Sequence, residues 1–95
     1  MKLVRDKIPE LYPQHAYRKA DQAEMLLLLR LKLVEEVGEA LSAPTQLDLA
    51  QELADVMDVV SSLAALSGIG SNQLAGFRNE KRAERGGFVD GWVLE

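Results

Sequence analysis

Two pairs of carboxylates in the middle of the chain have the spacing to share a cation. Glu39 follows Glu36 by three residues, and Asp55 follows Glu52 by three residues. Residues at positions i and i+3 share one face of a helix, so each pair would present both carboxylates on the same side. All-oxygen ligation suits a hard ion such as Mg²⁺ or Mn²⁺, and zinc is disfavoured. The pairs therefore predict a metal site with these four residues as ligands, because four close negative charges repel strongly unless a multivalent cation lies among them.

Each pair interrupts an apolar pattern. In the first segment Leu26, Leu29 and Leu33 set a spacing that predicts an apolar residue at position 36, where the chain has Glu36. Glu52 interrupts the same spacing in the second segment. A single Glu-x-x-Glu pair ordinarily lies on a solvated helix face, but an ionised carboxylate between packed helices is costly unless it is compensated. Two matched interruptions therefore favour a shared cation over two solvated surfaces.

Basic side chains suited to phosphate follow in a third segment. Their spacings of 3, 4 and 7 residues place them along one stripe of a helix. They are Arg78, Lys81, Arg82 and Arg85. Mg²⁺ binds substrate phosphates as readily as protein carboxylates, so acid pairs beside a basic stripe are typical of phosphoryl or nucleotidyl enzymes. A solvated helix surface explains the stripe equally well, and Arg5 or Lys7 could also hold phosphate oxygens.

The elements that must position these residues are helices. Apolar residues recur with helical spacing almost throughout, and no stretch alternates as a half-buried strand does, so we predict an all-α fold. A first long helix should begin at Asp21, whose side chain can cap it together with Glu24, and should end near Ser42. A second should follow Pro44, with Thr45 as its cap. The short connection makes the two helices antiparallel neighbours and brings the acid pairs toward each other.

Glycines and prolines set the other boundaries. Pro13 should stop a short opening helix, and the second long helix should end at Gly68. Ser71 is predicted to cap a third helix that ends at Gly86. We expect the apolar tail, residues 88–95, to pack on the body of the chain or on a neighbouring subunit.

Length and composition limit what such a chain can do. Its 95 residues form one domain, residues 1–95, whose core would be marginal, so pairing with a second subunit is favoured. The chain has no cysteine for disulfides or thiolate metal sites, and its net charge of −4 argues against a nucleic-acid partner. The longest apolar tract, residues 25–29, is too short to span a membrane, and the charged N-terminus offers no signal-peptide stretch. We therefore expect a cytoplasmic protein with neither membrane nor nucleic acid as a partner.

The acid pairs and the two ends of the chain resemble a known family. EEVGE at residues 35–39, followed after twelve residues by ELAD at residues 52–55, resembles the EExxE…ExxD signature of the MazG-like all-α nucleoside triphosphate pyrophosphohydrolases. That superfamily includes phosphoribosyl-ATP pyrophosphohydrolases and dimeric dUTPases. KLVRDKIP at residues 2–9 and KRAERGGF at residues 81–88 resemble a small single-domain subgroup, so the similarity spans nearly the whole chain.

The resemblance implies a fold, a reaction and a set of roles. It implies an antiparallel helical bundle whose four-helix core is completed by a second subunit, as a homodimer or homotetramer. The implied reaction is Mg²⁺-dependent hydrolysis of an NTP or dNTP to the monophosphate and pyrophosphate, which removes unwanted nucleotides from the pool. Glu36, Glu39, Glu52 and Asp55 would ligate Mg²⁺. Glu35 and Glu36 would be the catalytic carboxylates, with Glu35 an auxiliary ligand or the base that orients water.

Two other functions compete with this one. Phosphoribosyl-ATP hydrolysis in histidine biosynthesis uses the same chemistry, and rates on that compound and on a panel of dNTPs would separate the two. A non-catalytic helical dimerisation module would use its acidic seam to bind a basic partner or a structural cation, and would release no pyrophosphate. Asp58, three residues after Asp55, would either support the ligands or lie exposed.

Overall fold

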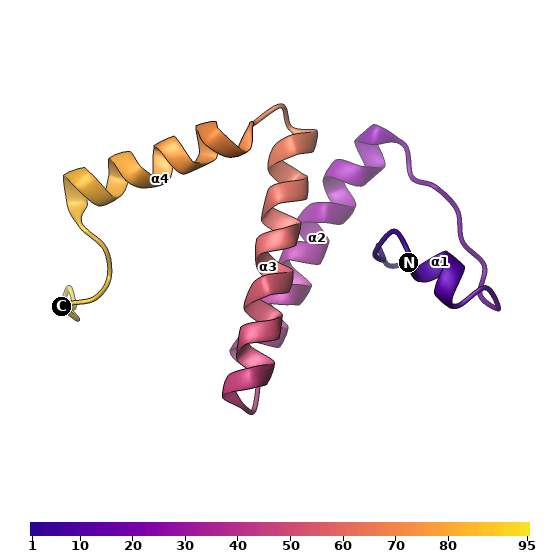
Figure 1. Ribbon diagram of the computed structural model, residues 1–95, viewed down its shortest axis with the longest axis horizontal. Coiled ribbons are helices and arrows are strands. Elements are labelled where there is room, and N and C mark those ends of the chain that lie inside the picture. Colours follow the sequence, from indigo (N-terminus) through magenta and orange to yellow (C-terminus); the bar gives the residue numbers. More distant parts are fainter.

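The structure is a computed structural model that describes residues 1–95, and all of its regular secondary structure is helical. In chain order these are α1 (Ile8–Leu11), α2 (Gln22–Leu41), α3 (Gln46–Leu66) and α4 (Ser71–Arg85). The α2 and α3 helices lie side by side, with α1 and the N-terminus on one flank and α4 extending from the other (Figure 1). The all-α prediction is therefore confirmed.

The predicted capping residues begin both long helices. Asp21 precedes α2, and its side chain accepts a hydrogen bond from the backbone N–H of Glu24 at 2.9 Å. Thr45 precedes α3, and its hydroxyl accepts a hydrogen bond from the backbone N–H of Asp48 at 3.1 Å. Each cap pairs an N–H group that the first turn of a helix leaves without an intrahelical partner. Both helix starts are confirmed.

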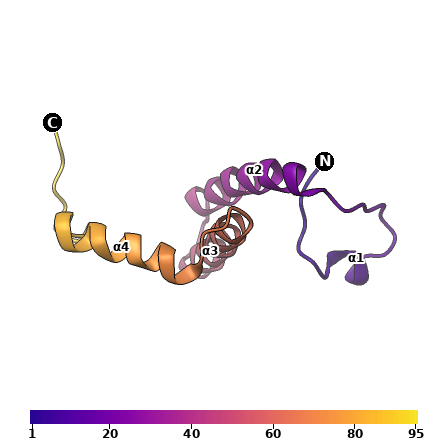
Figure 2. The ribbon, with the colours of Figure 1, turned by 90° about the horizontal axis from the view of Figure 1, so that it is seen from above.

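The α2–α3 pair contains the core of the chain. Its buried apolar side chains are Leu28, Leu29 and Val59. Only residues 42–45 connect the two helices, which therefore run antiparallel and contact each other (Figures 1 and 2). Other large apolar side chains of the pair stay exposed, among them Leu31, Val34 and Met57 at 57%, 72% and 68%. One chain therefore leaves a large apolar surface uncovered.

The α4 helix turns sharply away from α3. The two helices are bent by 114° at their connection (Figure 2). Gly68 in this connection has a φ of +79°, a left-handed conformation that follows the end of α3 and that glycine adopts without strain. The prediction that Ser71 caps α4 is wrong by one residue, because Gly70 takes the cap position with an extended backbone and Ser71 is the first helical residue. Gly86 ends α4 as predicted.

The C-terminal tail, residues 88–95, continues from the far end of α4 (Figure 1). Its side chains are solvated: Phe88, Trp92 and Leu94 are 104%, 93% and 100% exposed. The prediction that the tail packs on the body of the chain is wrong, because α4 carries it away from α2 and α3. Its packing on a neighbouring subunit stays a prediction.

The length and apolarity of the helices decide whether one of them could cross a membrane. None of them alone is both long enough and apolar enough to cross a membrane. Taken together, α3 and α4 meet the length and composition requirement, but the 114° bend separates them.

Candidate metal centre

Three carboxylates from two helices converge at the α2–α3 seam. Glu36 and Glu39 come from α2, and Glu52 comes from α3. One carboxylate oxygen from each lies within 4.8 Å of those of the other two. The i, i+3 spacing aligns the α2 pair, and the antiparallel connection brings α3 against it. The structure thus brings together three of the four ligands that the sequence predicts.

Two oxygens of this acid cluster (Glu36, Glu39 and Glu52) are buried without a partner. Glu36 is only 6% exposed, and neither its Oε2 atom nor the Oε2 atom of Glu52 has a hydrogen-bond partner. The other oxygen of Glu36, Oε1, lies 3.4 Å from the ammonium group of Lys32. Buried polar atoms are nearly always hydrogen-bonded or ligated, and an unpaired buried carboxylate is costly. The donor set therefore fits a hard divalent cation, which would satisfy these oxygens.

The charge of the cluster is reflected in the pKa of Glu52. This pKa is raised from 4.5 to about 7, because protonated Glu52 can hydrogen-bond to Glu39 and because desolvation disfavours the charged form. Repulsion from Glu39, Asp55 and Glu36 adds to the shift. Without a cation, Glu52 therefore takes up a proton near neutral pH, and a cation would compete with that proton.

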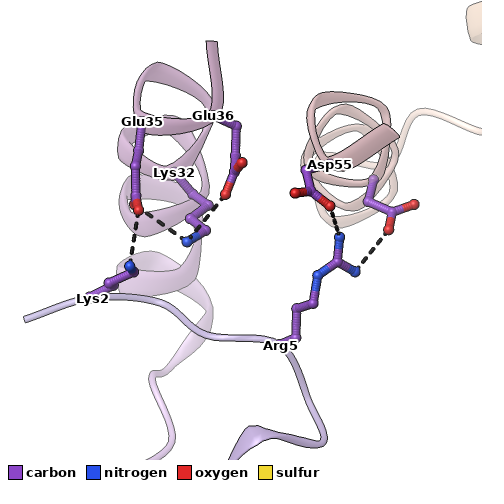
Figure 3. Close-up of polar contacts among 7 residues, drawn as sticks. Lys2, Arg5, Lys32, Glu35, Glu36 and Asp55 are labelled. Atoms are coloured by element: carbon purple, nitrogen blue, oxygen red, sulfur yellow. Dashed lines mark hydrogen bonds and ion pairs between the residues drawn. The ribbon is translucent and has the colours of Figure 1, made fainter. Parts of the chain in front are cut away.

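The fourth predicted ligand, Asp55, pairs instead with an arginine from the N-terminal segment. The Nη2 atom of Arg5 donates to Oδ1 of Asp55 at 2.6 Å, and its Nη1 atom donates to Oδ2 of Asp58 at 2.9 Å (Figure 3). Both carboxylates raise the pKa of Arg5, through hydrogen bonds to Asp58 and then to Asp55. Asp58 is thus an exposed partner of Arg5 in this structure.

Glu35 lies beside the cluster and is held by two lysines. Its Oε1 atom is 3.1 Å from the ammonium group of Lys2, and its Oε2 atom is 3.3 Å from that of Lys32 (Figure 3). The hydrogen bond from Lys2 is the largest cause of a lowered Glu35 pKa, and Lys32 contributes to the same shift. Sequence reasoning missed both lysines. The spacing of Lys32 to Glu35 and Glu36, three and four residues, is a signal that could have identified one of them.

A cleft of about 310 Å³ adjoins the acid cluster. Its walls come from residues 3–6, α2 and α3, and Lys32, Glu36 and Asp55 are among its lining residues. This volume lies at the lower end of the range for small-molecule sites. The cleft therefore offers space for part of a ligand next to the buried carboxylate of Glu36.

The predicted basic stripe lies elsewhere. Its members Arg78, Lys81, Arg82 and Arg85 are on α4, which contacts only α3 among the helices and extends away from α2 (Figure 2). None of the four forms an ion pair within the chain. The chain by itself does not bring the stripe to the acid cluster, and the basic groups beside the carboxylates are Lys2, Arg5 and Lys32.

Comparison of the chain with known protein families, curated proteins and solved structures finds no match.

Proposed function

We propose that this chain is a Mg²⁺-dependent nucleoside triphosphate pyrophosphohydrolase of the MazG-like kind, which converts an NTP or dNTP and water to the monophosphate and pyrophosphate. One observation carries the proposal. Glu36, Glu39 and Glu52 converge at the α2–α3 seam, and the Oε2 atom of Glu36 is buried there without a partner. Acidic clusters are common on helix surfaces, but a buried carboxylate oxygen needs a partner, and the Lys32 ammonium group pairs only with the other oxygen of Glu36.

Each carboxylate has a role under this proposal. Glu36, Glu39 and Glu52 would hold the cation, and Asp55 would complete the set when it is not paired with Arg5. Bound Mg²⁺ would neutralise charge on the triphosphate and lower the pKa of a water for attack at the α-phosphorus. Glu35 would accept a hydrogen bond from that water, since its lowered pKa keeps it ionised at neutral pH.

Phosphate oxygens would meet basic side chains from two sources. Arg5 and Lys32 line the cleft beside Glu36 and belong to the same chain as the acid cluster. The α4 stripe does not face that cluster, so we assign it to the site of a second copy, where its four basic side chains could reach the triphosphate.

A second copy would also complete the core. The apolar side chains that α2 and α3 leave exposed, such as Leu31, Val34 and Met57, would be covered by the same helices of another chain. Two α2–α3 pairs would then form an antiparallel four-helix core, in a homodimer or a homotetramer. A cytoplasmic location is consistent with a nucleotide substrate.

The test is a pyrophosphate-release screen on canonical and modified nucleotides, with phosphoribosyl-ATP included, in Mg²⁺, in Mn²⁺ and in EDTA. We expect turnover that requires the metal and that falls by at least about a hundredfold in Glu36→Gln, since even groups behind metal ligands contribute 10–100-fold. Glu80→Gln is the matched control, because Glu80 is an exposed carboxylate on α4.

The outcomes separate the candidate functions. Preferred turnover of phosphoribosyl-ATP would assign the biosynthetic reaction instead of nucleotide-pool cleaning. Absence of pyrophosphate release from every compound, with Mg²⁺ still raising the melting temperature, would indicate a helical module with a structural cation. Equal turnover in Glu36→Gln and Glu80→Gln would remove the proposed site.

A further inference from the structure

Residues 1–6, which we call the N-terminal strap, lie across the cleft and link both helices through charged side chains. Lys2 pairs with Glu35 on α2 at 3.1 Å, whereas Arg5 pairs with Asp55 and Asp58 on α3 at 2.6 and 2.9 Å (Figure 3). Strap residues 3–6 form one wall of the cleft. The strap therefore places a guanidinium group in the cleft that Glu36 of the acid cluster also lines.

Arg5 and a cation in the acid cluster would compete for Asp55. Asp55 is the only predicted ligand outside the converged cluster, and its Oδ1 atom accepts the shorter of the two Arg5 hydrogen bonds. The Arg5 side chain is 59% exposed and that of Asp55 is 36% exposed. Exposed ion pairs contribute little to stability, so this one can break without disturbing the fold. Asp58, which is separate from the cluster, can keep its hold on the guanidinium.

We propose that Arg5 is an exchange residue, which holds Asp55 while the metal site is empty and binds a phosphate of the substrate once Asp55 turns to the cation. The inference rests on the proposed function and adds a residue to its binding machinery. Release from Asp55 frees the Nη2 atom at the edge of the cleft, while the Nη1 atom stays on Asp58. A guanidinium anchored at one end and free at the other suits an oxyanion, because its donors form a planar fork.

Two titrations of the full chain by isothermal calorimetry test this exchange. The first uses Mg²⁺ alone, and the second uses inorganic triphosphate in saturating Mg²⁺, so that no nucleobase contributes. We expect Arg5→Gln to bind Mg²⁺ about threefold to tenfold more tightly than the wild type, because Asp55 is no longer paired. The same variant should bind triphosphate about tenfold more weakly.

Two controls separate the exchange from a change in overall charge. Lys19→Gln removes the same charge from an exposed position before α2, and Arg30→Gln removes it from an exposed position on α2. We expect the two controls to change Mg²⁺ affinity less than twofold. If Arg5→Gln loses helical content, Arg5→Lys replaces it in both titrations. Arg5→Lys should show a smaller gain in Mg²⁺ affinity and a smaller loss in triphosphate affinity, since an ammonium group can hold only one of the two carboxylates closely.

The results distinguish failure of the inference from failure of the function. The exchange would be overturned, and the metal site left standing, if the wild type and Arg5→Gln bound Mg²⁺ with the same affinity. Equal gains of Mg²⁺ affinity in Arg5→Gln and Lys19→Gln would overturn it in the same way. Absence of Mg²⁺ binding by the wild type would overturn the proposed function, and the exchange with it.

Discussion

The buried carboxylate of Glu36 predicts that one substitution should stabilise the metal-free chain. Glu36 is 6% exposed, its Oε2 atom has no partner, and its Oε1 atom lies 3.4 Å from Lys32. A buried unpaired polar atom costs about 1–3 kcal/mol, which Glu36→Leu would recover. Loss of the Lys32 pair offsets this by up to about 1 kcal/mol. After the full offset, we therefore expect Glu36→Leu to unfold in EDTA with a free energy up to about 2 kcal/mol higher than the wild type.

Saturating Mg²⁺ should reverse this order. A ligand that binds only the folded state adds about 2.7 kcal/mol at a concentration about a hundred times its dissociation constant. The wild type should gain this stability, and Glu36→Leu should not, because leucine offers no ligand. The wild type should then be the more stable protein by at least about 1 kcal/mol, and each 1 kcal/mol corresponds to about 4–8 °C in melting temperature for a domain of this size.

Thermal unfolding followed by circular dichroism measures both comparisons. Wild type, Glu36→Leu and Glu80→Gln would each be melted in EDTA and in Mg²⁺, and Glu80→Gln should follow the wild type under both conditions because Glu80 is exposed on α4. If Glu36→Leu were less stable than the wild type by the same margin in EDTA and in Mg²⁺, the carboxylate would be satisfied within the chain. The argument for a cation would then fail.

Two further predictions use the titration of Glu52 and the exposure of Trp92. In EDTA the free energy of unfolding should fall as pH rises from about 5 to 7. The pKa of Glu52 is about 7 in the folded chain and near 4.5 in the unfolded chain, so in this pH range the folded chain binds the proton that the unfolded chain has lost. Raising the pH removes this proton from the folded chain and with it the stability that the proton supplies. In urea unfolding, Glu52→Gln should make the free energy of unfolding nearly independent of pH between about 5 and 7. The same pH dependence in Glu52→Gln and the wild type would contradict the raised pKa of Glu52. Trp92, the only tryptophan, is 93% exposed, so iodide should quench its fluorescence readily in dilute protein. Quenching should weaken as subunits associate, and constant quenching at all concentrations would exclude tail packing.

The helix boundaries follow from local chemistry and were largely predictable from the sequence. Asp21 and Thr45 accept hydrogen bonds from residues three positions later, which depends only on neighbouring side chains. The start of α4 was misplaced because Gly70 and Ser71 are both acceptable at a helix start, and only the backbone conformation decides between them. The direction of α4, and so the position of the tail, depends on a turn at Gly68 whose angle the sequence does not specify.

The candidate site was predictable to the extent that periodicity controls it. Helical spacing aligns Glu36 with Glu39, and a short connection brings Glu52 opposite, so their convergence follows from two local rules. The pairing of Arg5 with Asp55 joins residues fifty positions apart, and the strap has no periodic pattern that would place it. Arg5 was therefore recognisable as a basic candidate, but its carboxylate partners were not.

The distribution of charge around the α2–α3 seam offers a reason for the carboxylates at apolar positions. The chain buries only three apolar side chains, yet it places glutamates at positions 36 and 52, where apolar residues would stabilise the helix pair. Sequences depart from their own pattern in this way mainly at functional sites. Around these inward carboxylates the nearest basic groups, Lys2, Arg5 and Lys32, are held by ion pairs with acidic side chains. Buried acidic groups with Lys32 beside them, and the exposed Lys2 and Arg5 around them, suit an anionic ligand that arrives together with its cation, because each charge of such a complex then meets its opposite.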